Sequence, residues 1–231
     1  GKLARMLRGR LQGGCGAAHG PPIFLDEAYR GPREDGGACI ADEVHTGFGR
    51  TGDHYWGFQH SGVVPDIVTM AKGLGNGAPL AAVTTRREIA DALTQRIHFN
   101  TFGGNPVSMA AGLAVLEVID AEGLQENCRV LGARLKTGLR TLMATHQLIG
   151  DVRGMGLMLG VELVRDRADK TPAREETLAV LEHARALGLL IGKGGLDGNV
   201  IRIKPPMCIT VEDVDFALDV LDRAILAASQ A

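Results

Sequence analysis

The feature that most constrains the fold of this chain is a series of short apolar runs separated by loops rich in glycine. The first run, Ala38–Ala41, ends at Asp42, and the second, Ile67–Ala71, ends at Lys72. A third run follows at Leu80–Thr84. Short apolar runs without strict alternation are typical of parallel strands that are buried on both faces. Because polar residues at the ends of such strands line ligand sites, the sequence predicts an α/β fold with its functional residues just after the strands.

Beyond Pro106 the apolar residues recur at helical spacing, which predicts a different kind of region. We place the boundary near residue 122, between a larger domain (1–122) and a smaller one (123–231). The smaller domain is predicted to contain helices packed on a short, mainly antiparallel sheet. The expected elements are helices over Val107–Ala121, Leu124–His146, Glu175–Leu187 and Val211 to about Ala228, the last capped by Thr210 and Asp213, an antiparallel pair within residues 149–163, and strands near Leu189–Ile191 and over Val200–Ile203.

Composition argues against several classes of partner. The 231 residues carry 25 basic and 27 acidic side chains, so a formal charge of -2 provides no basic excess for nucleic acid or an anionic membrane. No apolar run approaches the ~20 residues that cross a bilayer, and the first ten residues lack the pattern of a signal peptide. The four cysteines have no metal-binding or redox spacing, so we expect no metal site. A reduced, buried Cys39 indicates a reducing compartment, the cytoplasm or alternatively the mitochondrion.

Lys72 is the first residue whose sequence context indicates a specific chemical role. Most lysines are solvated surface residues. This lysine directly follows Met70 and Ala71 in an apolar stretch, so we expect it to be partly buried, which favours the neutral, nucleophilic amine. Glycines at positions 73, 75 and 77 leave room for a planar ring to approach. A nucleophilic lysine at a strand end is suited to forming a Schiff base with a carbonyl compound.

Asp42 ends the first predicted strand, where it would point into the crevice that binds ligands. A helix N-cap or a surface acid is an equally good interpretation of this residue taken alone. An apolar run followed by Asp-Glu also matches the metal-binding acid of a P-loop nucleotidase. That alternative fails because no G-x-x-x-x-G-K-[ST] sequence occurs in the chain.

Two further positions carry groups that suit anions. Thr101 opens the sequence Thr-Phe-Gly-Gly-Asn-Pro before the long helix, where a hydroxyl and backbone N–H groups can hold a phosphate. A plain capping turn would explain the same residues. Arg202 lies between Ile201 and Ile203, either as a surface charge on an edge strand or as a buried fork for a carboxylate. Taken alone, Arg202 favours the surface interpretation.

Together these segments resemble the class III aminotransferases, which use pyridoxal 5′-phosphate (PLP) and have the fold-type I architecture. The resemblance runs from about Leu11 to the end, and the combination of motifs is highly specific. It is strongest toward the mitochondrial-type alanine–glyoxylate branch. The motifs that carry it are residues 40–52 (IADEVHTGFGRTG), 65–73 (PDIVTMAKG), 98–106 (HFNTFGGNP) and 201–210 (IRIKPPMCIT).

The resemblance implies an incomplete large PLP-binding domain followed by a small α/β domain. Asp42 would pair with the pyridine nitrogen of PLP, and Val44 would pack on one face of the ring. His45 stands where the family usually has glutamine, and it would donate to the ring oxygen. Lys72 would carry the cofactor and move the α-proton of the substrate.

The same resemblance implies the reaction and its partners. Thr101 would bind the phosphate of the neighbouring subunit's cofactor, so a homodimer is implied, and Arg202 would bind the substrate carboxylate. The reaction would transfer an amino group from alanine or an ω/β-amino acid to a 2-oxo acid such as glyoxylate or pyruvate. Rivals on the same scaffold are a 4-aminobutyrate or ornithine transaminase, an aminomutase and a decarboxylase.

The chain also departs from the family pattern. Family members are considerably longer on the N-terminal side, and that region normally supplies a phosphate-binding turn and a ring-stacking aromatic residue. Residues 5–10 hold three arginines, which cannot fill a central strand without partners. Gly31-Pro32 is expected to interrupt a helix from Phe24 to about Arg33. These departures indicate a truncated or misread gene product, so the alternative function is a non-catalytic fragment that cannot retain PLP alone.

Overall fold

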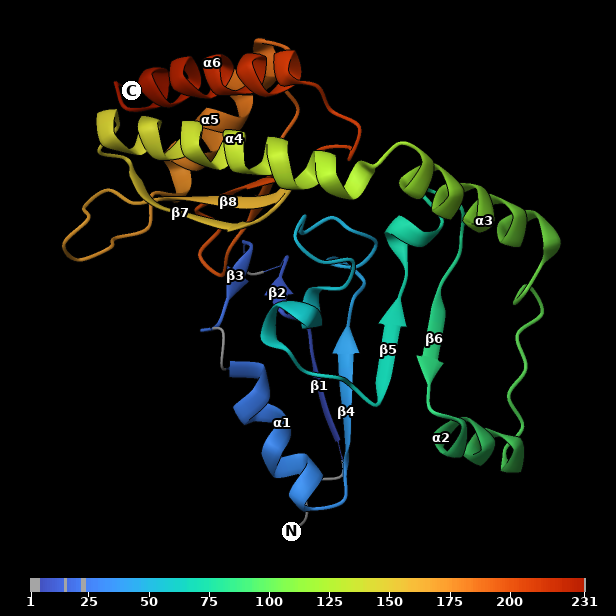
Figure 1. Cartoon of the computed structure of the whole chain (residues 1–231). Coiled ribbons are helices and arrows are strands. Elements are labelled where there is room, and N and C mark those ends of the chain that lie inside the picture. The colour runs from blue at the N-terminus through green and yellow to red at the C-terminus, as the bar shows by residue number, and fades with distance from the viewer. Residues whose placement is uncertain (1–4, 15, 22–23, 231) are drawn as a thin grey trace. The chain divides into compact units, whose positions relative to one another are not determined.

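A computed structural model of the chain describes residues 5–14, 16–21 and 24–230 (Figure 1). The chain divides into two compact units. The first contains Gly1–Arg10, Gly20–Gly49 and His54–Leu124, and the second contains Leu11–His19, Arg50–Asp53 and Gln125–Ala231. The domain boundary near residue 122 stays a prediction.

The first unit is built on a four-stranded sheet in the order β1-β4-β5-β6. β4 is parallel to both β1 and β5, and Ile40 pairs with Ile67 across the β4–β5 ladder. Cys39 and Ala41 of β4 are buried. The apolar runs before Asp42 and Lys72 are therefore confirmed as neighbouring parallel strands. The strands are β1 (Arg5–Arg8), β4 (Ala38–Asp42), β5 (Ile67–Met70) and β6 (Ala82–Thr85).

The third apolar run does not form a buried parallel strand. β6 pairs antiparallel with β5 at the edge of the sheet, and its Val83 is exposed. The reason is the short connection, since only residues 71–81, including the 3₁₀ helix η2 (Lys72–Leu74), separate β5 from β6. A parallel return needs a crossover of about a dozen residues or more, usually with a helix. The chain therefore turns back directly beside β5.

Helix α1 (Phe24–Glu34) shows that the break expected at Gly31-Pro32 is wrong. Pro32 lies in the last turn, where its ring removes a backbone hydrogen bond without ending the helix. Its side chain is buried on the same face as Leu25 and Tyr29. Leu25 and Tyr29 pack with Cys39 of β4, so tertiary contacts hold the helix through the proline.

The arginine-rich N-terminal segment contains β1 at an edge of the described sheet, and both Arg8 and Arg10 have partners. The guanidinium carbon of Arg8 lies 4.5 Å from the centre of the Phe24 ring, a cation–π contact. The buried Arg10 donates to the carbonyl of Gly20 at 2.7 Å. An edge position lets the segment be a strand in spite of its charges.

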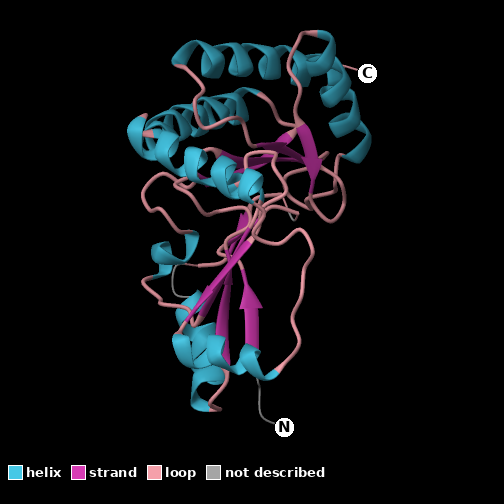
Figure 2. Ribbon diagram, turned by 90° about the vertical axis from the view of Figure 1, so that its right-hand side faces the viewer, coloured by secondary structure: helices cyan, strands magenta, loops and turns pink. Residues whose placement is uncertain are grey.

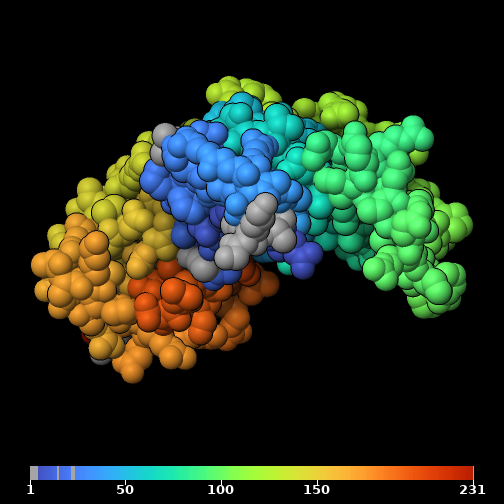
Figure 3. Space-filling model, turned by 90° about the horizontal axis from the view of Figure 1, so that it is seen from below, coloured from blue at the N-terminus to red at the C-terminus, as the bar shows by residue number. Residues whose placement is uncertain are grey.

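The remaining elements of the first unit connect the sheet to a long C-terminal helix. The 3₁₀ helix η1 (Gly57–Ser61) precedes β5, while α2 (Arg87–Asp91) and η3 (Ala92–Gln95) follow β6. Helix α3 (Pro106–Ala121) confirms the helix predicted there. Residues 91–104 are exposed throughout, and Figure 3 shows the residues near position 100, in green, at the surface.

The second unit contains a four-stranded sheet in the order β7-β8-β10-β9, with every pair antiparallel. Figures 1 and 2 show the helices of this unit on one side of its sheet. Among the described helices of the chain, none combines the length and the hydropathy that a bilayer span requires. The elements are β2 (Leu11–Gln12), β3 (Ala18–His19), α4 (Leu124–Thr145), β7 (Ile149–Met155), β8 (Met158–Leu163), α5 (Arg174–Ala186), β9 (Gly192–Gly194), β10 (Val200–Ile203) and α6 (Val211–Ala228).

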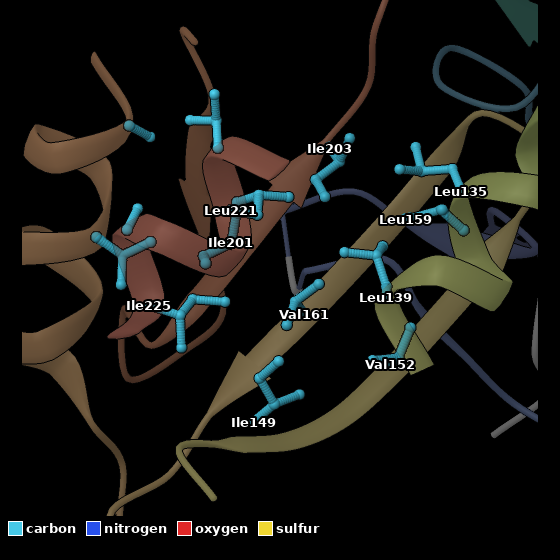
Figure 4. Close-up of a cluster of buried hydrophobic side chains, with 14 of the residues drawn as sticks. Leu135, Leu139, Ile149, Val152, Leu159, Val161, Ile201, Ile203, Leu221 and Ile225 are labelled. Atoms are coloured by element: carbon cyan, nitrogen blue, oxygen red, sulfur yellow. The ribbon is translucent and has the colours of Figure 1, made fainter. Parts of the chain in front are cut away.

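Apolar side chains from these helices and strands form one core (Figure 4). Leu139 of α4, Val161 of β8 and Ile225 of α6 are all fully buried in it. The predicted helices and antiparallel strands of this region are confirmed, apart from one shift in position. The strand expected near Leu189–Ile191 begins three residues later as β9, because Leu189 and Ile191 pack against the core while the following glycines pair with β10.

Candidate functional site

The ends of β4 and β5 bring together four of the residues that the sequence indicated. Asp42 is the last residue of β4, and Val44 and His45 follow it in a turn. Lys72 lies two residues beyond the end of β5. Because β4 and β5 are adjacent and parallel, the segments that follow them leave the sheet at the same edge (Figure 1). Asp42 pairs with Thr69, so Lys72 lies three residues further along its chain than the partner of Asp42.

The backbone at Lys72 is held by its neighbours while the side chain itself is exposed. Met70 and Leu74 on either side are buried in one apolar cluster with Phe48. Lys72 has a φ of 46°, a left-handed conformation that is uncommon outside glycine and concentrated at functional sites. The expected burial of Lys72 is wrong for this chain, because the tight turn η2 places its apolar neighbours inward. The Lys72 amine makes no ion pair or hydrogen bond with the described residues.

Asp42 is half-buried and is followed by a turn, so its interpretation as a helix N-cap is wrong. Its Oδ1 accepts a hydrogen bond from the Val44 N–H at 3.1 Å. Its Oδ2 has no hydrogen-bond partner within the described part of the chain. Val44 and His45 are also half-buried. One carboxylate oxygen thus orients the turn, and the other can accept from a ligand.

Glu43 was not predicted from the sequence as a site residue, although its carboxylate accepts more hydrogen bonds than that of Asp42. It is 1% exposed, and its carboxylate accepts hydrogen bonds from the Thr46 hydroxyl (2.7 Å) and from the N–H groups of Gly57 and Phe58 (both 2.8 Å). Burial raises the pKa of Glu43 above its ordinary value, and these three hydrogen bonds oppose that shift. The sequence signal that could have identified Glu43 was its position as the second acid of the Asp42-Glu43 pair. Because successive residues of a strand face opposite sides, the two acids were expected to have different surroundings.

Thr101 lies in the exposed segment between η3 and α3. Asn105 is the N-cap of α3 and accepts from the Ser108 N–H at 2.9 Å, with Pro106 as the first helical residue. The capping interpretation therefore explains Asn105 and Pro106. It does not explain Thr101, whose hydroxyl makes no hydrogen bond with the described residues.

Arg202 belongs to the second unit, where β10 lies between β8 and β9, so its interpretation as an edge-strand charge is wrong. The residues paired with it on the two neighbouring strands are both glycines, Gly160 and Gly192. A Cβ built on Gly192 would lie 3.6 Å from a terminal nitrogen of Arg202, so the guanidinium passes over this glycine. Arg202 borders a cavity of about 200 Å³ and pairs with no carboxylate of the described residues.

Comparison with known proteins identifies the family. The family model described as aminotransferase class-III matches residues 4–225. The chain belongs to the class III aminotransferases. Members of this family are PLP-dependent and have the fold-type I architecture.

Individual relatives of this class III aminotransferase chain support the same family assignment. It is 55% identical over 225 residues to alanine–glyoxylate aminotransferase 2 homolog 2, mitochondrial, from Arabidopsis thaliana, covering 97% of this chain and 47% of that protein. It is 50% identical over 217 residues to alanine–glyoxylate aminotransferase 2, mitochondrial, from Homo sapiens, covering 93% and 42%. A phospholyase from Arthrobacter, solved in complex with phosphoethanolamine, matches with a TM-score of 0.94 at 36% identity, covering 98% and 54%. The chain thus spans about half the length of these relatives.

The residues at the two strand ends of this class III aminotransferase chain fit PLP. The cofactor needs an amine for its aldehyde and an anion for its pyridine nitrogen. The exposed amine of Lys72 and the Asp42 Oδ2, which has no hydrogen-bond partner within the described residues, are groups of these kinds at the ends of neighbouring strands. Among the described residues, no group of three or more His, Cys, Asp and Glu side chains could hold a metal ion.

Proposed function

We propose that this chain carries the catalytic lysine of a transaminase that moves an amino group from an amino acid to a 2-oxo acid through PLP. The proposed donor is alanine or an ω/β-amino acid, and the proposed acceptor is glyoxylate or pyruvate. The observation that supports this most directly is the arrangement at the ends of β4 and β5. There, the segments that carry the exposed amine of Lys72 and the Asp42 Oδ2 leave the same edge of the sheet, and this Oδ2 has no hydrogen-bond partner among the described residues.

Each residue at the strand ends has a separate task in this proposal. PLP, when bound, withdraws electrons from the α-carbon of the substrate. Asp42 keeps the pyridine nitrogen protonated through its Oδ2, Val44 covers one face of the ring, and His45 donates to the ring oxygen. The amine of Lys72 would hold the cofactor covalently until the amine of the substrate displaces it, and the freed Lys72 amine would then take up and return the proton at the substrate's α-carbon.

Arg202 binds the carboxylate that the amino acid and the 2-oxo acid have in common. A guanidinium offers two parallel N–H donors to a carboxylate, which fixes its orientation as well as its position. The residues paired with Arg202 on the two neighbouring strands are glycines, so neither of them places a side chain beside its guanidinium. Alanine and glyoxylate are preferred as the substrate pair because two relatives at 50% identity or more are named for them.

The working enzyme is proposed to be a homodimer in which Thr101 binds the phosphate of the neighbouring subunit's cofactor. Supporting this, the segment around Thr101 exposes several large apolar side chains. Ile97, Phe99, Phe102 and Val107 are 102%, 83%, 81% and 79% exposed. Exposed apolar side chains concentrated in one segment mark an interaction surface, and a second copy of the chain is the proposed occupant.

The covalent link to PLP provides the central test. Wild-type protein mixed with PLP should develop a visible absorption band, and reduction with borohydride should fix the label on the peptide containing Lys72. The Lys72→Ala variant should lose both signals. Lys170→Ala, which removes an exposed lysine of the second unit, is the matched control and should retain them. A wild-type chain without the band, or with label spread over other lysines, contradicts the proposal.

A non-catalytic fragment that cannot retain PLP alone is the second candidate. The observation that favours it is coverage, since the chain spans 47% and 42% of its two named relatives. Under this alternative the wild-type chain folds but shows no PLP band at any cofactor concentration. If the band forms, amino-donor screening distinguishes the substrates. Equal rates with alanine, 4-aminobutyrate and ornithine would contradict the alanine–glyoxylate preference, and phosphate release from phosphoethanolamine would indicate a lyase.

For the compartment, the names of the Arabidopsis and human relatives favour the mitochondrion over the cytoplasm expected from the sequence. Fractionation of source cells, followed by detection of the chain with an antibody, tests this proposal. Recovery in the soluble cytoplasmic fraction alone would contradict it.

A further inference from the structure

The carboxylate of Glu43 joins the two ends of the loop that follows β4. Thr46 stands near the beginning of this loop, and Gly57 and Phe58 stand at its end, yet all three donate to the same side chain. The backbone of Glu43 is fixed as well, because its N–H donates to the Thr69 carbonyl of β5 at 2.9 Å. A buried carboxylate with three donors is strongly held, since charge-assisted hydrogen bonds are about twice as strong as neutral ones.

We propose that Glu43 is a positioning residue, whose carboxylate closes the loop of residues 44–58 and thereby fixes Asp42, Val44 and His45 where the PLP ring binds. This inference rests on the proposed function. Successive residues of a strand face opposite sides, so Asp42 can face the cofactor while Glu43 reaches back into the loop. Glu43 thus acts through its neighbours and does not itself touch the cofactor.

Close packing inside the loop supports the same role. A Cβ on Gly57 would lie 2.7 Å from the Thr46 side chain and 3.2 Å from Oε2 of Glu43. A Cβ on Gly47 would lie 2.9 Å from the Trp56 ring. The two ends of the loop therefore meet around the carboxylate without space for another atom.

The closed loop also reaches the lysine. Phe48 stacks edge-on against Trp56 within the loop, with ring centres 5.1 Å apart. The same Phe48 belongs to the apolar cluster of Met70 and Leu74, the residues that flank Lys72. Opening the loop would therefore loosen the supports of both Asp42 and Lys72.

The first test replaces Glu43 with glutamine, which keeps the shape but turns one acceptor oxygen into a donor. At least one of the three hydrogen bonds is then lost. In the cofactor-free protein, backbone amides of residues 44–61 should exchange hydrogen at least tenfold faster than in wild type. The affinity for PLP, measured by equilibrium dialysis, should fall about tenfold to hundredfold. The matched control is Glu34→Gln, which changes an exposed acid of α1 and should alter neither quantity.

A second pair of variants separates positioning from packing. Thr46→Ser keeps the hydroxyl that donates to Glu43 and removes a methyl group, whereas Thr46→Val keeps the shape and removes the hydroxyl. If the hydrogen bond matters, the serine variant binds PLP nearly as wild type does, and the valine variant loses about tenfold in affinity. The reverse order is expected if Thr46 only fills space, and it would overturn the inference.

The pH at which the visible band of lysine-bound PLP changes form provides a spectroscopic readout. It depends on the anion held at the pyridine nitrogen, so Glu43→Gln should shift this midpoint relative to wild type while Glu34→Gln should not. Unchanged loop exchange, or faster exchange with unchanged PLP affinity and midpoint, overturns the role of Glu43 and leaves the proposed function intact. A wild-type chain that binds no PLP overturns the proposed function, and this inference with it.

Discussion

Individual glycines in the loop after β4 leave no room for a side chain. Gly57 faces Thr46 and Glu43 at distances that a Cβ could not keep, and Gly47 faces Trp56 in the same way. Protein interiors are packed closely enough that one added methyl group forces neighbours to move. These positions therefore decide whether the loop can close over Glu43.

We expect Gly57→Ala to lower the free energy of unfolding by about 1–3 kcal/mol, because the new methyl group overlaps Thr46. The control is Gly14→Ala, where a Cβ would meet nothing within 4 Å. That variant should change stability by no more than about 0.5 kcal/mol. Urea denaturation of both variants measures the difference, and equal stabilities would show that the loop relaxes without cost.

Cys128 gives a prediction about pH. It is fully buried in the core of the second unit, and burial raises its pKa from 9.0 to about 11. Between these two values the unfolded chain releases the thiol proton while the folded chain keeps it, so stability falls as pH rises. Under reducing conditions, Cys128 should account for a loss of about 2–3 kcal/mol over this range, measured as the difference between the wild-type and Cys128→Ala profiles. Cys128→Ala should show a flatter profile, whereas Cys208→Ala, at an exposed thiol, should keep the wild-type slope.

Among the helices and strands, predictions from local sequence patterns are confirmed where residues close in sequence supply the hydrogen-bonding groups. The capping of α6 is an example, because Thr210 and Asp213 each bond the backbone N–H of the other, as the sequence predicts. The direction of β6 and the continuity of α1 through Pro32 were predicted wrongly. Both depend on what the element packs against, and local preference alone does not determine that.

Removing the cap of α6 should have a measurable cost. Thr210→Ala leaves the Asp213 N–H without its side-chain acceptor and should lower the free energy of unfolding by about 1 kcal/mol. The control is Thr141→Ala, at an exposed position inside α4, which should raise stability by a few tenths of a kcal/mol, since alanine is the better helix former. Thermal or urea unfolding measures both. Equal effects of the two substitutions would mean that water replaces the cap.

For the assembled molecule, the proposed sharing of Thr101 between subunits has a direct test. Lys72→Ala lacks the lysine, and Thr101→Ala lacks the phosphate-binding hydroxyl. In a mixed dimer, the site with an intact lysine receives an intact Thr101 from its partner. Co-refolding equal amounts should therefore restore about a quarter of the wild-type PLP band, the statistical share of complete sites. Each variant refolded alone is the control, and a mixture that restores nothing would indicate that Thr101 serves its own subunit.

The sequence by itself determined the parallel strands β4 and β5, the helices α3, α4 and α6, and the family. These features are encoded by apolar periodicity and by a combination of motifs, which are local properties of the chain. Only the tertiary structure decided that Lys72 is exposed, that β10 is an interior strand and that Glu43 closes its loop. Burial and hydrogen bonding at these positions depend on residues distant in sequence, such as Gly57 for Glu43 and Gly160 for Arg202. A local pattern does not specify such contacts, because they form only when the chain is folded.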